Sequence, residues 1–304
     1  MRAAQRGVAV VLAMGVVALA AIAATAIIVP QSIWVRQNQL TNEHVQAQVM
    51  VQAGVDWIRA VLSDDRRVSN VDHLGEAWAL RMPVMPIEKG ELAGHIDDQQ
   101  GMFNLNNLVQ EGKVSATHLP RFKRLLALLN LPGTLADALV DWMDADSAPQ
   151  LQGGAEDEYY LGLNPPYLAS NRPLTDVAEL ALVRGFDSPT RARLRPFVTA
   201  LPRFTSINVN TAPPEVLAAT IEGLGINGAR MLVEQRQRAY FRDNADFLNR
   251  LPQGAVAEDS DVSISSDYFM ATLRVTIGEA QARAMVLLAR VDAGWPIIIW
   301  RKYL

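Results

Sequence analysis

The chain has no cysteine among its 304 residues. Disulfides, thiolate metal sites and cysteine nucleophiles are therefore excluded. It also has few histidines, and their scattered positions argue against a zinc or redox-metal site; they are His44, His73, His95 and His118. The net charge is only −4 and the basic residues are dispersed. Charge therefore gives no indication of a surface for nucleic acid or anionic lipid.

Catalytic signatures are missing too. The sequence contains no nucleophile elbow, no phosphate-binding loop and no metalloprotease helix. Paired carboxylates near aromatic residues do occur, as they do in glycoside hydrolases, but that chemistry needs one carboxylic acid held neutral in an apolar pocket. The sequence indicates no such pocket, and we expect a protein that is not an enzyme.

Basic residues are absent from one long stretch, between Arg124 and Arg172. Its centre reads "DWMDADSAPQLQGGAEDEYY" (residues 141–160). The carboxylates of the stretch are Asp137, Asp141, Asp144, Asp146, Glu156, Asp157 and Glu158. So many like charges require a metal ion, a shared proton, a basic surface elsewhere in the molecule, or solvent. The residue types alone leave these possibilities open.

Charged residues are also absent from Val8 to Val29. At 1.5 Å per residue, a helix of this length spans the roughly 30 Å hydrocarbon core of a bilayer. Arg2 and Arg6 precede it, which predicts a cytoplasmic N-terminus and an exported remainder. A removable secretory signal is the alternative, although the apolar run exceeds the usual ~7–15 residues.

An amphipathic helix follows the apolar segment. After Pro30 no proline occurs before Leu62, and apolar residues recur at three- and four-residue spacings, at Ala47, Val51, Val55, Ile58 and Leu62. If Val8 to Leu62 is continuous, it forms a rod of roughly 80 Å with one end in lipid and the other on a folded domain. The stem residues Ile33, Trp34 and Leu40 could cover either a neighbouring subunit or this chain's own sheet.

Strand patterns lie at both ends of the exported part. "ELAGHIDDQQGMFNLNNL" (91–108) alternates apolar and polar residues around a turn at Gly101. Three further apolar or alternating runs fill the C-terminal region: "DVSISSDYFMATLRVTIGE", "ARAMVLLARVD" and "WPIIIWRKYL". They predict an antiparallel sheet with one buried face, against which the stem packs.

The region between these strands has helical periodicity up to about Leu251. Three stretches loosely repeat a helix–turn–helix pattern, at 125–142, 179–197 and 217–236. The third, around Gly223 and Gly225, resembles the helix-hairpin-helix modules that hold a DNA phosphate at a helix N-terminus. A membrane-anchored DNA-binding protein is thus an alternative function, although Glu222 precedes the turn and we expect no nucleic acid partner.

The leader "MRAAQRG" followed by an uncharged helix resembles the type IV pilin class. The resemblance implies removal of the leader between Gly7 and Val8 by a prepilin peptidase, and methylation of the new N-terminus. Pilins usually carry a glutamate at the fifth mature position, whereas this chain has Leu12. A carboxylate in the bilayer needs a partner, so its absence suits a special position in a filament.

The motifs "DQQGMFNLNNL", "DALVDWMDADSAPQLQGGAEDEYY", "NPPYLASNRPLTDVAEL" and "SINVNTAPPEVLAA" resemble the minor pseudopilin K family of type II secretion systems, also called general secretion pathway protein K. The resemblance implies an α+β, type IV pilin-like fold with a large inserted helical domain. The limits expected are a leader (1–7), a transmembrane helix (8–29), stem and first strands (30–108), the insert (109–205), and a helix-hairpin-helix-like segment with the last strands (206–304).

The same resemblance implies a position with minor pseudopilins I and J at the tip of a pseudopilus, where the complex helps to initiate assembly and to export folded proteins. The implied contacts also include the major pseudopilin, the inner-membrane assembly platform and the exported substrate. The expected location is the bacterial inner membrane, with one transmembrane pass and a periplasmic folded domain.

Bound calcium in the inserted domain is a further implication of the resemblance, and the acidic loop has suitable chemistry. Calcium takes six to eight oxygen ligands in a flexible geometry. Gly153 and Gly154 would let the chain turn back. The expected ligands are Asp144, Asp146, Glu156 and Asp157. The spacing does not match an EF-hand, and a solvated acidic loop is the alternative.

Overall fold

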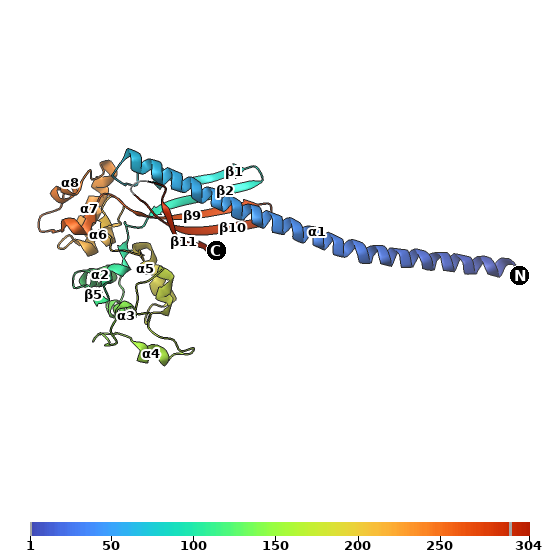
Figure 1. Ribbon diagram of the computed structural model, residues 1–304, viewed down its shortest axis with the longest axis horizontal. Helices are drawn as coiled ribbons and strands as arrows, with labels where there is room; N and C mark the ends of the chain where they lie inside the picture. The colour runs from blue at the N-terminus through green and yellow to red at the C-terminus, as the bar shows by residue number, and fades with distance from the viewer. Residues whose placement is uncertain (1, 292–293) are drawn as a thin grey trace.

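The computed structural model describes residues 2–291 and 294–304. One helix, α1 (Arg2–Val68), comprises 67 residues and continues through Pro30, so it is about 100 Å long. Its N-terminal half extends freely away from the folded part (Figure 1). The segment Gly7–Ala26 is long and apolar enough to cross a membrane, and none of it is buried. The predicted long rod is therefore present.

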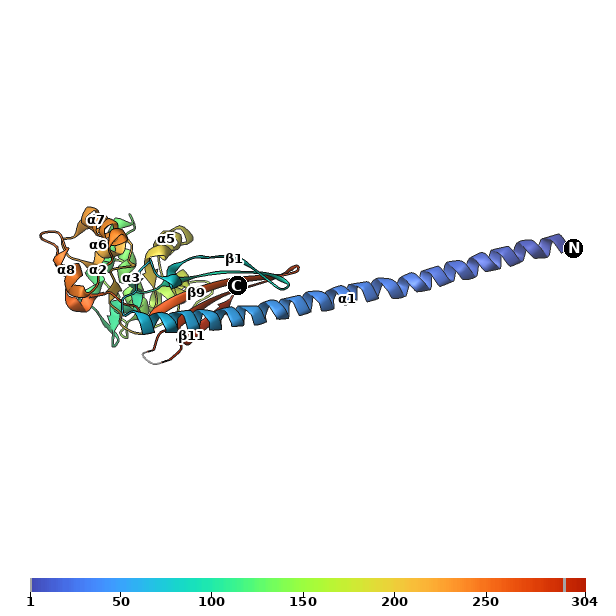
Figure 2. The same ribbon diagram turned by 90° about the horizontal axis from the view of Figure 1, so that it is seen from above.

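A five-stranded antiparallel sheet lies beside the C-terminal half of α1, in the order β1-β2-β9-β10-β11 (Figures 1 and 2). The strands are β1 (Met82–Ile87), β2 (Gly90–Asp98), β9 (Tyr268–Ile277), β10 (Ala280–Ala289) and β11 (Ile297–Tyr303). The apolar stem residues predicted to face the sheet do so: Ala47, Val51, Val55, Ile58 and Leu62 are at most 1% exposed. They share one core with Phe269, Leu273 and Val275.

Strand β1 is an element that the sequence patterns did not predict. Its sequence MPVMPI contains two prolines, which argue against a strand because proline cannot donate to the hydrogen-bond ladder. The strand is tolerated because it lies at the edge of the sheet, where it pairs with β2 on one side, with a register shift between Met82 and Met85.

A helical region connects β2 to β9. Its α-helices are α2 (His118–Leu128), α3 (Thr134–Met143), α4 (Asp157–Leu161), α5 (Ser188–Leu194), α6 (Pro214–Thr220), α7 (Gly225–Arg238) and α8 (Asn244–Asn249). Short 3-10 helices occur at Ala77–Ala79, Leu105–Leu108, Val177–Leu182, Arg195–Phe197 and Asp259–Asp261.

Three two-stranded pairs add to this region: β3 (Phe103–Asn104) with β6 (Val198–Thr199), β4 (Val109–Gln110) with β5 (Lys113–Val114), and β7 (Ile207–Asn208) with β8 (Val262–Ser263). One apolar core runs from Phe103 to Val262. It crosses the predicted limit between residues 205 and 206, so α6 to α8 pack with the rest of the helical region. The stem and the sheet form a separate core.

Buried polar groups join the stem, the sheet and the helical region. Arg290, just beyond β10, donates to Asp72 at 2.7 Å and to Asp65 of α1 at 2.9 Å. Its guanidinium also lies over the ring of Phe269. The side chains of Arg290 and Asp72 are each only 2% exposed. Removal of either one would therefore leave the other as an uncompensated buried charge.

A second buried carboxylate, Asp98 at the end of β2, lies at the same junction. It accepts hydrogen bonds from Asn208 at 3.0 Å and from Ser266 at 2.7 Å. Burial raises the pKa of Asp98 to about 6, although hydrogen bonds from Thr211 and Ser266 act to lower it. Asn208 belongs to the helical region, so this carboxylate ties that region to the sheet.

Candidate metal centre

The acidic loop connects α3 to α4, and Figure 1 places α4 at the end of the helical region away from α1. Helix α3 ends because Asp144 leaves the helical conformation, with φ −73° and ψ 175°. The chain then forms an irregular loop before Glu156 begins α4 as its N-cap residue. Asp144 and Glu156 therefore stand at the two ends of the loop.

Three of the predicted ligands come together. Asp144, Asp146 and Glu156 each offer a carboxylate oxygen within 4.8 Å of the others. Asp144 is 1% exposed and Glu156 is 6% exposed. Within residues 2–291 and 294–304, all four carboxylate oxygens of these two residues lack a hydrogen-bond partner. Buried carboxylates without partners are costly, so this geometry calls for a cation or for protons.

The pKa values of Asp144 and Glu156 show that, without a cation, the site disfavours their ionised forms. Burial, together with the nearby charges of Asp146 and Asp141, raises the pKa of Asp144 to about 6. Burial likewise raises the pKa of Glu156 to about 7, with Asp141 as the largest charge contribution. Both shifts disfavour the ionised form that a metal ion would bind. A divalent cation between the carboxylates would reverse both effects.

The path of the loop depends on close backbone packing. Asp141 is fully buried and accepts a hydrogen bond from the backbone N–H of Gln150 at 3.1 Å, so it holds the loop. A Cβ on Gly154 would lie 2.2 Å from the Asp141 carboxylate and 2.4 Å from Gln150 N. Gly153 has φ +101°, which glycine adopts readily. The two glycines thus allow the return of the chain that presents Glu156.

Asp157, the fourth predicted ligand, lies outside this three-residue group. Its Oδ1 accepts a hydrogen bond from the backbone N–H of Ala169 at 2.9 Å. Asp146 also has a protein donor, the backbone N–H of Ala148 at 2.8 Å. Asp137 pairs with Lys123 at 2.8 Å. Among the residues that the structure describes, most carboxylates of the stretch therefore have protein partners, Glu158 is exposed, and Asp144 and Glu156 are the buried carboxylates without a hydrogen-bond donor.

The donor set fits calcium. Oxygen ligands from carboxylates, completed by backbone carbonyls and water, are what calcium binds, and an irregular loop suits its flexible geometry. Carboxylates alone do not favour zinc, which prefers nitrogen and sulfur ligands. The arrangement can thus hold a structural cation that neutralises Asp144, Asp146 and Glu156 and joins α3 to α4.

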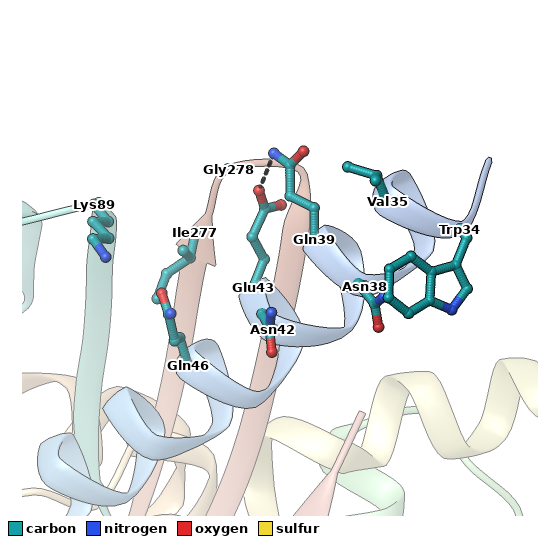
Figure 3. A pocket seen from close by; sticks show the side chains of 10 residues that line it. All are labelled: Trp34, Val35, Asn38, Gln39, Asn42, Glu43, Gln46, Lys89, Ile277 and Gly278. Carbon is teal, nitrogen blue, oxygen red and sulfur yellow. Dashed lines mark hydrogen bonds between the residues drawn. The ribbon is translucent and has the colours of Figure 1, made fainter. Parts of the chain in front are cut away.

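A groove of about 580 Å³ lies elsewhere, between the stem and the tips of the two β-hairpins (Figure 3). Lys89, Ile277 and Gly278 form one wall, and one face of the stem forms the other, with Trp34, Val35, Asn38, Gln39, Asn42, Glu43 and Gln46. Glu43 accepts hydrogen bonds from Gln39 at 2.8 Å and from the backbone N–H of Glu279 at 3.0 Å. A Cβ on Gly278 would lie 2.5 Å from the Glu43 carboxyl carbon. These contacts hold the hairpin tip against the stem.

The glycine turn of the third repeat does join two helices, α6 and α7. Gly223 and Gly225 have positive φ, +74° and +62°. A Cβ on Gly223 would lie 2.2 Å from the carbonyl oxygen of Gly254, so packing against the neighbouring chain explains this glycine. Helix α7 has basic residues in its last turn, at Arg236 and Arg238, far from the glycine turn.

Comparisons with known proteins extend these observations. Two family models, each described as type II secretion system (T2SS), protein K, match residues 101–203 and 207–265. A type II secretion system protein K from Pseudomonas aeruginosa is 38% identical, covering 97% of this chain and 90% of the relative. The chain belongs to the type II secretion system protein K family. The predicted minor pseudopilin is thus confirmed, and the DNA-binding alternative is not supported.

Another protein K, from Klebsiella pneumoniae, is 33% identical over 98% of this chain and 96% of the relative. A solved structure is also similar: the crystal structure of the GspK-GspI-GspJ complex from the enterotoxigenic Escherichia coli type 2 secretion system. The match has a TM-score of 0.77 and 25% identity, and covers 88% of this chain and 99% of that one. The α+β fold with the long N-terminal helix is thereby confirmed. Membership in this family is consistent with a protein that is not an enzyme.

The predicted processing site lies within α1. In the described part of the chain, nothing outside the local helix backbone lies within 4 Å of a Cβ built on Gly7, and Val8 is 62% exposed. The stem residues Ile33, Trp34 and Leu40 are exposed by 54%, 66% and 37%, so they do not cover this chain's own sheet. Sequence reasoning also missed the buried group of Arg290 and Asp72, because the two residues are 218 positions apart.

Proposed function

We propose that this chain is the tip subunit of a type II secretion pseudopilus, where it assembles with minor pseudopilins I and J and initiates the filament that exports folded proteins. The observation that carries this proposal is the similarity along nearly the whole chain to protein K in the GspK-GspI-GspJ complex. Leu12, at the fifth position after Gly7, supports it. A tip subunit has no subunit ahead of it, so it needs no carboxylate at that position.

The stem offers a surface for the partner subunits. Val45, Val49, Ala53 and Trp57 are spaced by four residues and lie on the exposed face of α1. Val45, Val49 and Trp57 are exposed by 52%, 59% and 51%. Residues at this spacing form one continuous stripe on a helix. An apolar stripe of this kind fits the stem helices of neighbouring pseudopilins.

Binding to pseudopilins I and J tests the proposal. The full-length chain in detergent is expected to form a complex with them, and Val49→Ser with Trp57→Ser is expected to weaken it at least about tenfold, because a buried aromatic anchor commonly contributes 1–2 kcal/mol or more. Met231→Ser removes an equally exposed apolar side chain from α7 and serves as the matched control. Absence of any complex with the unaltered chain would remove the tip assignment.

Processing provides a separate test. We infer that a prepilin peptidase removes residues 1–7 and that the new N-terminus at Val8 is methylated, with the tail on the cytoplasmic side and the folded part in the periplasm. Arg2 and Arg6 before the apolar segment support this orientation. Intact-mass measurement of the membrane-extracted protein is expected to show a chain that begins at Val8 with one added methyl group. A mature chain that begins elsewhere would contradict the pilin-type leader.

The other implied partners are the major pseudopilin, the inner-membrane assembly platform and the exported substrate. We further propose that calcium bound by Asp144, Asp146 and Glu156 stabilises the helical region. The unpartnered oxygens of Asp144 and Glu156 support this role. The ion is structural, because it would hold the loop between α3 and α4 without acting on a substrate.

A further inference from the structure

Three carboxylates meet one guanidinium at the end of the stem. Asp65 lies in the last turn of α1, whereas Asp72 and Glu76 lie in the connecting segment (residues 69–76) that follows it. One carboxylate oxygen of each residue lies within 4.8 Å of the others. Within the described residues, both ion pairs of this group go to Arg290, at 2.9 Å from Asp65 and 2.7 Å from Asp72. When all three carboxylates are ionised, the group therefore has three negative charges and one positive charge.

Water compensates this excess charge poorly, because the group is largely buried. Asp72 is 1% exposed, and the side chain of Asp65 is 15% exposed. Glu76 is half-buried. Its Oε2 accepts hydrogen bonds from the backbone N–H of His73 and from the Nε1–H of Trp78, both at 2.8 Å. These neutral donors hold Glu76 in place and leave the excess charge.

A proton relieves the repulsion among the three carboxylates, because like charges this close in a poorly hydrated site do not ionise together readily. Burial, together with the nearby charges of Glu76 and Asp72, raises the pKa of Asp65 to about 6, although Arg290 acts to lower it. Burial also raises the pKa of Glu76, and the charge of Asp72 acts in the same direction. One bound proton removes half of the excess negative charge.

The connecting segment also contacts the chain on both sides of the junction. The backbone N–H of Asp72 donates to the carbonyl of Ile264 at 2.8 Å, and its carboxylate accepts from the backbone N–H of Ser266 at 2.8 Å. Ile264 packs against the core of the helical region. The ring of His73 stacks on that of Tyr240, with 4.1 Å between the centroids. Repulsion that moves the segment away from α1 therefore acts against its contacts with the helical region.

We propose that this charged group is a pH-sensitive clamp between the stem and the connecting segment, tight in mildly acidic surroundings and loose in alkaline ones. Opening of the clamp hydrates Asp65 and separates it from Glu76, so the open form binds the proton more weakly. The pKa of Asp65 is thus higher in the closed form. Its contribution is fully present below about pH 4 and is lost as pH rises through about 6. The clamp is independent of the tip assignment.

Two further titratable groups among the described residues lie at the same junction. His73 belongs to the connecting segment, and burial lowers its pKa, so its protonation opposes the closed form as pH falls. Asp98, at the end of β2, has its pKa raised to about 6 by burial, so it acts in the same direction as Asp65. Comparison of the unaltered chain with a variant of Asp65 isolates the clamp, because both chains carry His73 and Asp98.

Asp65→Asn tests the clamp, because asparagine keeps an acceptor for Arg290 and removes the charge. The measurement is hydrogen exchange of the connecting segment in the full-length chain in detergent, expressed as protection relative to an unstructured chain at the same pH. In the unaltered chain this protection is expected to fall at least about tenfold between pH 5 and pH 7.5. The reason is that each pH unit between the two pKa values of Asp65 changes the ratio of closed to open forms by up to about tenfold.

The variant is expected to differ from the unaltered chain mainly at the higher pH. At pH 7.5 the segment in Asp65→Asn should be at least about threefold better protected, whereas at pH 5 the two chains should agree within about twofold, because Asp65 is then mostly protonated. Asp64→Asn removes an exposed carboxylate from the same turn. This control should show the same pH dependence as the unaltered chain.

Equal protection of the unaltered chain at the two pH values would overturn the proposal. Lower protection of Asp65→Asn at pH 7.5 would also overturn it, because Asp65 would then be an ordinary ion-pair partner of Arg290. If Asp65→Asn does not fold, Glu76→Gln replaces it, since glutamine still accepts hydrogen bonds and the largest charge that raises the pKa of Asp65 is removed. Glu76→Gln must then be better protected than the unaltered chain at pH 7.5, and equal or lower protection would refute the clamp.

Discussion

Addition of calcium to the chelator-treated, full-length chain is expected to raise the melting temperature of the helical region by about 5–10 °C. A ligand at a hundred times its Kd stabilises the folded state by about 2.7 kcal/mol, and each kcal/mol corresponds to about 2–4 °C in a domain of this size. The physical reason is that the oxygens of Asp144 and Glu156 are buried without partners. Differential scanning calorimetry in detergent measures the shift.

Two variants and one control locate the ion. Asp144→Asn and Glu156→Gln each remove a charge from the cluster and are expected to abolish most of the calcium-dependent shift. Glu158→Gln removes an exposed carboxylate from the same stretch, and it should retain the full shift. A shift that all three variants share equally would place calcium elsewhere, and no shift in the unaltered chain would leave the solvated loop as the explanation.

The raised pKa values give this prediction a pH dependence. Without metal, the folded chain retains protons on Asp144 and Glu156 up to about pH 6 and pH 7, whereas the unfolded chain releases them near pH 4. The metal-free chain therefore loses stability as pH rises from about 4 to about 7. Calcium binds the ionised carboxylates, so its stabilising effect declines as pH falls through that range. A calcium shift that is equal at pH 5 and pH 8 would contradict this.

Replacement of Arg290 by methionine is expected to destabilise the protein by about 3–5 kcal/mol. Removal of one member of a buried ion pair leaves the other charge uncompensated, and here Asp72 is buried while Asp65 is half-buried. Urea unfolding followed by tryptophan fluorescence measures the change. Arg274→Met, at an exposed position on β9, is the control and should change stability by no more than about 0.5 kcal/mol.

Replacement of the carboxylates that pair with Arg290 distinguishes an effect of its charge from an effect of its packing. If the cost of Arg290→Met comes from uncompensated charge, a further change of Asp65 and Asp72 to asparagine recovers part of the lost stability. If Arg290 acts only through its contact with Phe269, the added changes recover nothing. An unfolding free energy for Arg290→Met within about 1 kcal/mol of the unaltered chain would show that the junction is not held by this ion pair.

The sequence patterns predicted the stem helix and the long strands, because the side chains that these elements bury recur at regular spacings along the chain. The stem residues from Ala47 to Leu62 repeat at helical spacing, and all five face the sheet. The strands β9, β10 and β11 alternate or form apolar runs, and they pair as neighbours in the sequence. Strand β1 escaped prediction, because its prolines are compatible only with an edge position that the sequence does not reveal.

The sequence located the loop of the candidate metal centre, but it did not show which carboxylates of the loop come together. Carboxylate density identified the loop, yet Asp157 faces the backbone of Ala169 and Asp141 holds Gln150. Which carboxylate turns inward depends on the three-dimensional return of the chain at Gly154, and residue type does not record it. The pairing of Arg290 with Asp72 was out of reach for a similar reason, since it depends on how the whole sheet closes against the stem.

The place at which the helical region joins the sheet has a mechanical consequence. Asp98 at the end of β2 pairs with Phe269 of β9, and the N–H of Gln99 donates to the carbonyl of Tyr268 at 2.9 Å. The whole helical region is thus an enlarged loop between two adjacent antiparallel strands. A force applied along α1 passes into the sheet through the shared apolar core. The helical region joins this path where β2 ends and β9 begins, through the buried groups of Asp98, Asn208 and Ser266.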